Sequence, residues 1–131
     1  MRKISNHTIN PDLEPLLVQA VDQPGPGGAN HHYLIRVDSP DDPQRDGNPG
    51  QPREILDLHF QEGPVYAYGI NGVTNAALLA IIIDRLDGFQ RGQFPCSYNA
   101  NATHHVRKAL EALHDRTKSR ISRGVEGTNQ A

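Results

Sequence analysis

Two arginines near the C-terminal end have the spacing of an anion-binding pair. Arg116 and Arg120 are four residues apart, so on a helix they lie on the same face. Their guanidinium groups suit bidentate contact with phosphate oxygens, and Lys118 and Arg123 add positive charge nearby. A diphosphate would fit this pair. The alternative is structural, because cations stabilise the last turns of a helix by about 0.3–1 kcal/mol each.

A second candidate lies in residues 88–99, where Phe89, Phe94 and Tyr98 gather in a chain of three phenylalanines and four tyrosines. Stacking a purine on such a ring contributes on the order of 1–3 kcal/mol. The side-chain amide of Asn99 can pair with a base or ribose edge. The alternative is that Phe89 packs in a hairpin core and Asn99 caps a helix.

Catalytic and metal-binding signals are weaker. Asp57 and His59 alternate along a predicted strand and could form an acid–base pair, although a strand exposes polar residues on its outer face in any case. No serine or cysteine stands in a nucleophile motif. The histidine pairs 31–32 and 104–105 are adjacent, so each pair points to different sides of its element. We therefore predict no catalytic residue and no metal site.

The composition restricts the partners. A net charge of −2, from 13 basic and 15 acidic residues, predicts no nucleic-acid partner. The longest apolar run, residues 76–83, is far short of the roughly 20 residues that span a bilayer, so no membrane partner is expected. Cys96 is the only cysteine, which excludes an internal disulfide and makes the cytosol the default compartment.

The elements that would position these residues divide the chain. We predict a single domain, residues 1–131, in which residues 1–70 are β-rich and residues 71–128 form a helical hairpin. Runs at 33–37, 54–60 and 65–68 are rich in branched and aromatic residues and predict antiparallel strands, with a tight turn at 62–64 and a polar loop at 39–52. The glycine-rich run 23–29 lacks the ending of a phosphate-binding loop and predicts a turn.

Thr74 has the position of a helix cap, and apolar residues recur after it at helical spacing. The first helix ends at Gly88 or Gly92, before Pro95. Helices over 74–90 and 99–123 would be about 25 and 37 Å long.

The predicted class is α+β: a small N-terminal antiparallel β-sheet followed by a C-terminal two-helix antiparallel hairpin. With 36% hydrophobic residues and no tryptophan, the core is modest, so we expect a homo-oligomer.

Two segments of the helical half carry a resemblance to a known phage family. They are Asn71-Gly72-Val73-Thr74-Asn75 with Leu78-Leu79, Ile83-Asp84-Arg85-Leu86 and Gly88-Phe89-Gln90, and then Arg116-Thr117 through Arg123-Gly124-Val125-Glu126-Gly127-Thr128. Here the chain resembles the Thoeris anti-defence family, whose hairpin is shared with phage sponges that bind CBASS cyclic oligonucleotides. A looser match runs from Pro24 to His31, and the loop 39–52 is not covered.

The resemblance implies a non-enzymatic protein without a cofactor that binds glycocyclic ADP-ribose, the signal of bacterial TIR-domain enzymes, in the host bacterial cytoplasm. It implies a dimer or hexamer, and it implies that Phe89, Asn99, Arg116 and Arg120 hold the ligand. Relatives often carry Arg-Glu before that asparagine, whereas this chain has Ser97-Tyr98. The choice between cyclic ADP-ribose forms and cyclic oligonucleotides therefore stays open.

Helix geometry adds one expectation. Asn99 and Arg116 are separated by ~25 Å of helix, so one protomer cannot bring both ends of the hairpin to one ligand. We predict a site shared between chains. Two alternatives stay open: a hydrolase of the same signal that uses Asp57 and His59, and a phage nucleic-acid accessory module that uses the basic end of the second helix.

Overall fold

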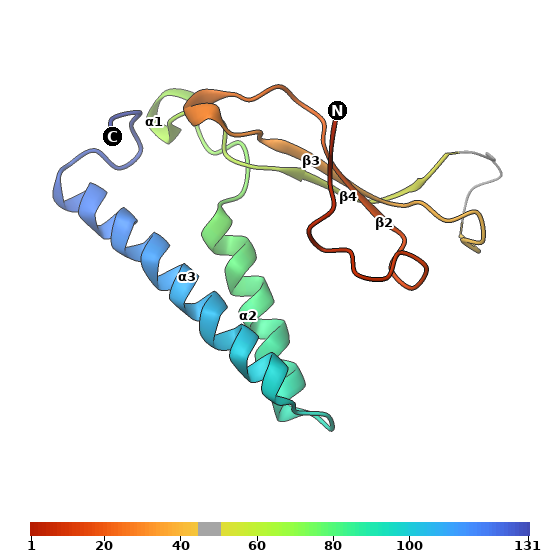
Figure 1. The fold of residues 1–131 in the computed structure, drawn as a ribbon. Coiled ribbons are helices and arrows are strands. Elements are labelled where there is room, and N and C mark those ends of the chain that lie inside the picture. The colour runs from red at the N-terminus through yellow and green to blue at the C-terminus, as the bar shows by residue number, and fades with distance from the viewer. Residues whose placement is uncertain (45–50) are drawn as a thin grey trace. The chain divides into compact units, whose positions relative to one another are not determined.

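The computed structural model describes residues 1–44 and 51–131, which form two compact units, Met1–Glu62 and Gly63–Ala131. The first unit contains an antiparallel sheet and the second a helical hairpin (Figure 1). The predicted α+β class and the order of its two parts are confirmed. Part of the predicted loop 39–52, residues 45–50 with Asp46, lies outside the described residues.

The sheet has four strands in the order β1-β2-β3-β4: β1 (Arg2–Ile4), β2 (Leu16–Ala20), β3 (His32–Val37) and β4 (Arg53–His59). The predictions at 33–37 and 54–60 are confirmed within one residue. The prediction missed β1 and β2. The reason is that β1 has three residues and β2 opens with a short apolar run, which periodicity cannot assign.

A β-bulge sets which side chains of β4 share a face. Ile35 pairs with Leu56 and Arg36 pairs with Glu54, so Ile55 is an extra residue on β4. Beyond it, Leu56 and Leu58 lie opposite Ile35 and Tyr33, while Asp57 and His59 lie opposite Leu34 and His32. Alternation thus places Leu56 and Leu58 on one face of β4 and Asp57 and His59 on the other. The expected split into a buried face and an exposed face does not hold, because Leu56 is 41% exposed and Asp57 lies opposite the buried Leu34.

The turn between β2 and β3 contains the glycine-rich run. A single 3-10 turn, Pro26–Gly28, forms there, and Gly27 and Gly28 adopt positive φ angles of 81° and 89°. The Asp22 carboxylate accepts hydrogen bonds from the His31 backbone N–H at 2.9 Å and from the Asn30 side chain at 3.2 Å. The hydrogen bond from His31 is the main cause that lowers the pKa of Asp22. This run is a turn, as predicted.

The strand predicted at 65–68 is wrong, and so is the hairpin turn predicted before it. Residues Val65–Tyr68 form one helical turn, α1, which Pro64 precedes and Gly69 ends with a φ of 71°. Four residues, three of them branched or aromatic, are too few for propensity to decide their conformation. A tertiary contact decides it here, because the Tyr66 backbone N–H donates to the Gly127 carbonyl at 3.2 Å.

The first long helix, α2 (Asn75–Arg91), begins as predicted. The Thr74 hydroxyl accepts a hydrogen bond from the Ala77 backbone N–H at 3.1 Å, which caps the helix. Of the two glycines that could end it, Gly92 is the C-cap. The 17 residues of α2 form the first helix of the hairpin.

The sequence offers Ser97, Asn99 and Asn101 as starts of the second long helix. This helix, α3 (Ser97–Ser122), begins at the first of them, but its cap is Cys96. The Cys96 Sγ accepts a hydrogen bond from the Asn99 backbone N–H at 3.4 Å. The Gln90 side chain bonds both the N–H and the carbonyl of Cys96, at 3.0 and 3.1 Å, and so closes the connector between the helices. Asn99 is therefore inside α3 rather than at its cap.

The core is small in both units. Among described residues, the buried apolar side chains are Ala20 and Leu34 in the sheet and Ile83 in the hairpin. Ile81, Ile82 and Phe89 on α2 remain exposed. An ion pair between Arg107 and Asp87 joins the two helices across their interface. No helix in the described ranges is sufficiently long and apolar to cross a membrane.

Candidate functional site

Arg120 is buried near the end of α3, with 6% of its surface exposed. Its guanidinium group donates to the Glu126 carboxylate at 3.0 Å and to the carbonyls of Val125, Thr128 and Gln130 at 2.9, 3.0 and 2.5 Å. One carboxylate and three carbonyl oxygens thus surround this group. The segment that follows α3 thus supplies every hydrogen-bond acceptor that the structure shows for this guanidinium group.

Arg116, one helical turn earlier, has different surroundings. It is exposed, and within the described ranges its guanidinium group has no hydrogen-bond or ion-pair partner. Lys118 is likewise exposed, whereas the Arg123 side chain donates to the Ala131 carbonyl at 2.6 Å. The two arginines predicted to act together therefore differ: Arg116 is available to a ligand, and Arg120 already binds its own chain.

Phe89 lies in the last turns of α2, and 52% of its surface is exposed. The Arg85 guanidinium carbon is 5.3 Å from the centre of its ring, a cation–π contact. Arg85 was not among the predicted site residues, although its position four residues before Phe89 on a helix was a usable signal. A ring with one cation beside it and an open face suits a stacked base with phosphates nearby.

Asn99 is the third residue of α3, and its side chain is half-buried. Its backbone is held by Cys96 and by the Thr103 hydroxyl, which donates to the Asn99 carbonyl at 2.7 Å. Its side-chain amide has no hydrogen-bond partner in the described part of the chain. A rigid backbone with an uncommitted amide is a suitable arrangement for reading a ligand edge.

The hairpin places these four residues in two groups. A short connector joins the end of α2 to the start of α3 (Figure 1). By their positions in these helices, Phe89 and Asn99 lie beside the connector, and Arg116 and Arg120 lie towards the other end of α3. Because α3 is continuous, Asn99 and Arg116 are separated by ~25 Å of helix. The structure of one chain does not bring the two groups together.

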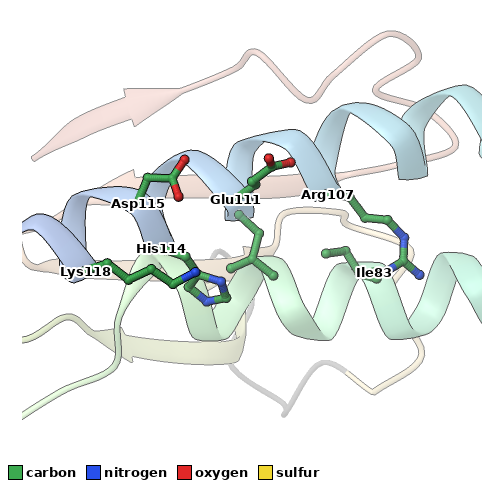
Figure 2. A pocket seen from close by; sticks show the side chains of 7 residues that line it. Ile83, Arg107, Glu111, His114, Asp115 and Lys118 are labelled. Carbon is green, nitrogen blue, oxygen red and sulfur yellow. The ribbon is translucent and has the colours of Figure 1, made fainter.

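A pocket of about 210 Å³ lies between the helices (Figure 2). Ile83 of α2 lines it together with six residues of α3: Arg107, Leu110, Glu111, His114, Asp115 and Lys118. Pockets for ligands of drug size hold about 300–1,000 Å³, so this one is too small for a dinucleotide. None of the four predicted residues lines it, and its charges are mixed.

The predicted acid–base pair on β4 has a third member. Asp57 Oδ1 is 3.1 Å from His59 Nε2 and 2.7 Å from His32 Nε2. The two imidazole rings stack with centres 4.1 Å apart. The sequence prediction missed His32 because its position beside His59 depends on the register between β3 and β4, which alternation within one strand does not reveal.

No family model matches the chain. It is 44% identical over 77 residues to a protein named Thoeris anti-defense 1, from Bacillus phage SBSphiJ7. This match covers 59% of the chain and 54% of the phage protein, so the matched part spans about half the length of that relative.

Proposed function

On the premise that the chain is related to the Thoeris anti-defence family, we propose that it is a phage anti-defence protein that sequesters glycocyclic ADP-ribose. The signal would be withheld from its effector and not degraded, so the protein would act as a sponge without enzymatic activity or cofactor. The observation that carries this proposal is the 44% identity to a protein named for anti-defence against Thoeris.

The surroundings of the candidate residues support distinct roles. Phe89 offers an exposed ring to the adenine, and Arg85 beside it adds positive charge. Asn99 offers its side-chain amide to a base or ribose edge. Arg116 is the exposed cation for the pyrophosphate. Arg120 contacts the ligand only after the segment 125–131 leaves its guanidinium group.

A site shared between chains agrees with the dimensions of α3. The connector of one chain would supply Phe89 and Asn99, and the distal end of a partner's α3 would supply Arg116. Homo-oligomerisation would also cover apolar side chains that the helical unit leaves exposed, among them Ile81, Phe94 and Tyr98. We propose a dimer, or a hexamer built from dimers, acting in the host cytoplasm.

The nucleic-acid alternative is less well supported by the contacts. Arg107 pairs with Asp87, Lys108 with Glu111, and Arg120 with Glu126. They are three of the six basic residues on which that alternative depends, the others being Arg116, Lys118 and Arg123. The hydrolase alternative uses Asp57 and His59, which belong to the sheet unit, whereas the four candidate ligand-binding residues belong to the helical unit.

Calorimetry of the full chain with glycocyclic ADP-ribose tests the proposal. We expect saturable binding, followed by recovery of chemically unchanged ligand from the denatured protein. Absence of heat at about 100 µM ligand would mean binding weaker than about −5.5 kcal/mol and would reject a sponge. Turnover that disappears in His59→Ala would instead establish the hydrolase.

A further inference from the structure

The polar face of the sheet carries a group of side chains that the proposed function does not use. His32 of β3 with Asp57 and His59 of β4 each offer one metal-ligand atom, and these atoms lie within 4.8 Å of one another. The set contains two imidazole nitrogens and one carboxylate oxygen. We name these three residues the His-Asp-His cluster.

Backbone pairing holds this cluster in place. His32 and His59 are direct partners in the β3–β4 register, and side chains in such positions start about 5 Å apart. Asp57 is two residues before His59 and so shares its face. The bulge at Ile55 lies just before Asp57 and determines the face on which both β4 residues point. The cluster is therefore set by rigid elements and not by a loop.

We propose that the His-Asp-His cluster binds a divalent transition-metal ion of the Zn²⁺ class. The ligands would be Nε2 of His32, Nε2 of His59 and a carboxylate oxygen of Asp57. Imidazole with carboxylate suits zinc and its neighbours, whereas calcium and magnesium prefer oxygen ligands throughout. Three protein ligands leave a coordination position for water.

The distances require little rearrangement. Zinc bonds of about 2.0–2.2 Å in a tetrahedron place ligand atoms roughly 3.3 Å apart. Asp57 Oδ1 is now 2.7 and 3.1 Å from the two Nε2 atoms. The side chains are 32%, 47% and 56% exposed for His32, Asp57 and His59, so they can separate by a few tenths of an ångström. In the metal-bound form each Nε2 gives its lone pair to the ion, and each neutral imidazole carries its single proton on Nδ1.

The sequence analysis predicted no metal site because the histidines of each adjacent pair point to different sides of their element. That reasoning does not apply to a cluster built from two different strands. The cluster takes His32 without His31 and completes the set from β4. A bound ion would link β3 to its neighbour β4, which is the edge strand of the sheet. All three ligands of this site belong to the sheet unit, and the proposal does not depend on the proposed nucleotide binding.

Two measurements on the full chain test the site. Calorimetry with Zn²⁺ should show one equivalent bound per chain, and Co²⁺ should give the intense visible absorption of a tetrahedral site. His32→Gln and His59→Gln should each weaken binding by at least about tenfold. His104→Gln is the matched control, because His104 is an exposed histidine next to another on α3, and this variant should bind as the unmodified chain does.

The proposal is overturned if about 100 µM Zn²⁺ gives no binding, if both cluster variants bind like the unmodified chain, or if His104→Gln loses the ion equally. A readout on the unmodified chain guards against variants that disturb the sheet. Adding Zn²⁺ should move the ¹⁵N resonances of His32 and His59 Nε2 and leave those of His104 in place. Movement of His104 alone would overturn the assignment.

Discussion

At the scale of single residues, Arg120 and Arg116 show how the same side chain takes different roles one helical turn apart. Arg120 is buried and bonds four oxygen atoms of the segment that follows α3, whereas Arg116 is exposed. Breaking a buried charged network leaves polar groups without partners, and the cost is large. Removing an exposed side chain costs little.

Arg120→Ala should therefore lower the free energy of unfolding by roughly 3 kcal/mol, because Glu126 and three carbonyls lose their donor. Urea denaturation followed by circular dichroism measures this change. Arg116→Ala serves as the control and should stay within about 0.5 kcal/mol of the unmodified chain. Equal stability of the two variants would contradict a structural role for Arg120.

Arg116→Ala should weaken ligand binding while leaving the fold intact. A charge-assisted hydrogen bond contributes about 1.5–3 kcal/mol, so the dissociation constant for glycocyclic ADP-ribose should rise by roughly tenfold or more. Lys118→Ala, which removes another exposed cation on the same helix, should change it much less. Similar effects from both variants would indicate a general electrostatic attraction instead of a specific contact.

At the scale of elements, caps and turns decide where the chain changes direction. Thr74 caps α2 through its hydroxyl, and Asp22 organises the turn into β3 through its carboxylate. Both are short side chains that satisfy backbone N–H groups which no regular element would satisfy. Each contribution can be removed without changing the buried core.

Thr74→Ala should destabilise the helical unit by about 1 kcal/mol, since the Ala77 backbone N–H loses its acceptor. Thermal unfolding monitored at a helix-sensitive wavelength provides the measurement. Thr74→Ser keeps the hydroxyl and should retain most of the stability. A serine variant as unstable as the alanine variant would show that the methyl group, not the cap, matters.

Asp22→Ala should lower the melting temperature of the sheet unit at neutral pH, and this difference should disappear in acid. The hydrogen bond from His31 lowers the pKa of Asp22 in the folded state. Its contribution is therefore fully present above the ordinary aspartate pKa, about 3.9, and is lost as the pH falls through the lowered pKa. Melting curves from pH 7 to pH 2 test this, and a pH-independent difference would contradict it.

At the scale of the whole molecule, the candidate ligand-binding residues do not meet within one chain. Phe89 and Asn99 lie at the connector, and Arg116 lies ~25 Å along α3 from Asn99. The pocket between α2 and α3 is small and is lined by other residues. The proposed ligand site is therefore one that two protomers share.

Mixing Phe89→Ala chains with Arg116→Ala chains tests this arrangement. In a symmetric dimer with shared sites, each mixed dimer contains one site with both residues intact, so about a quarter of normal binding should return after subunit exchange. Native mass spectrometry verifies the exchange, and calorimetry measures the recovered sites. No recovery in verified mixed dimers, or a ligand contacting all four residues of one protomer, would contradict a shared site.

The sequence by itself determined the features that depend on local patterns. The cap at Thr74, the continuous α3, the division of β4 into two faces and the order of sheet before hairpin all follow from spacing and capping chemistry. The relationship to an anti-defence protein also rests on sequence. The distance between Asn99 and Arg116 follows from the number of residues between them on one helix.

The tertiary structure decided the features that depend on residues far apart in the chain. Residues Val65–Tyr68 became helical beside Gly127 rather than extended, and His32 joined Asp57 and His59 through strand register. The burial of Arg120 arises from a segment that returns over its guanidinium group. Such contacts leave no periodic signal, because what a side chain binds depends on where the rest of the chain passes.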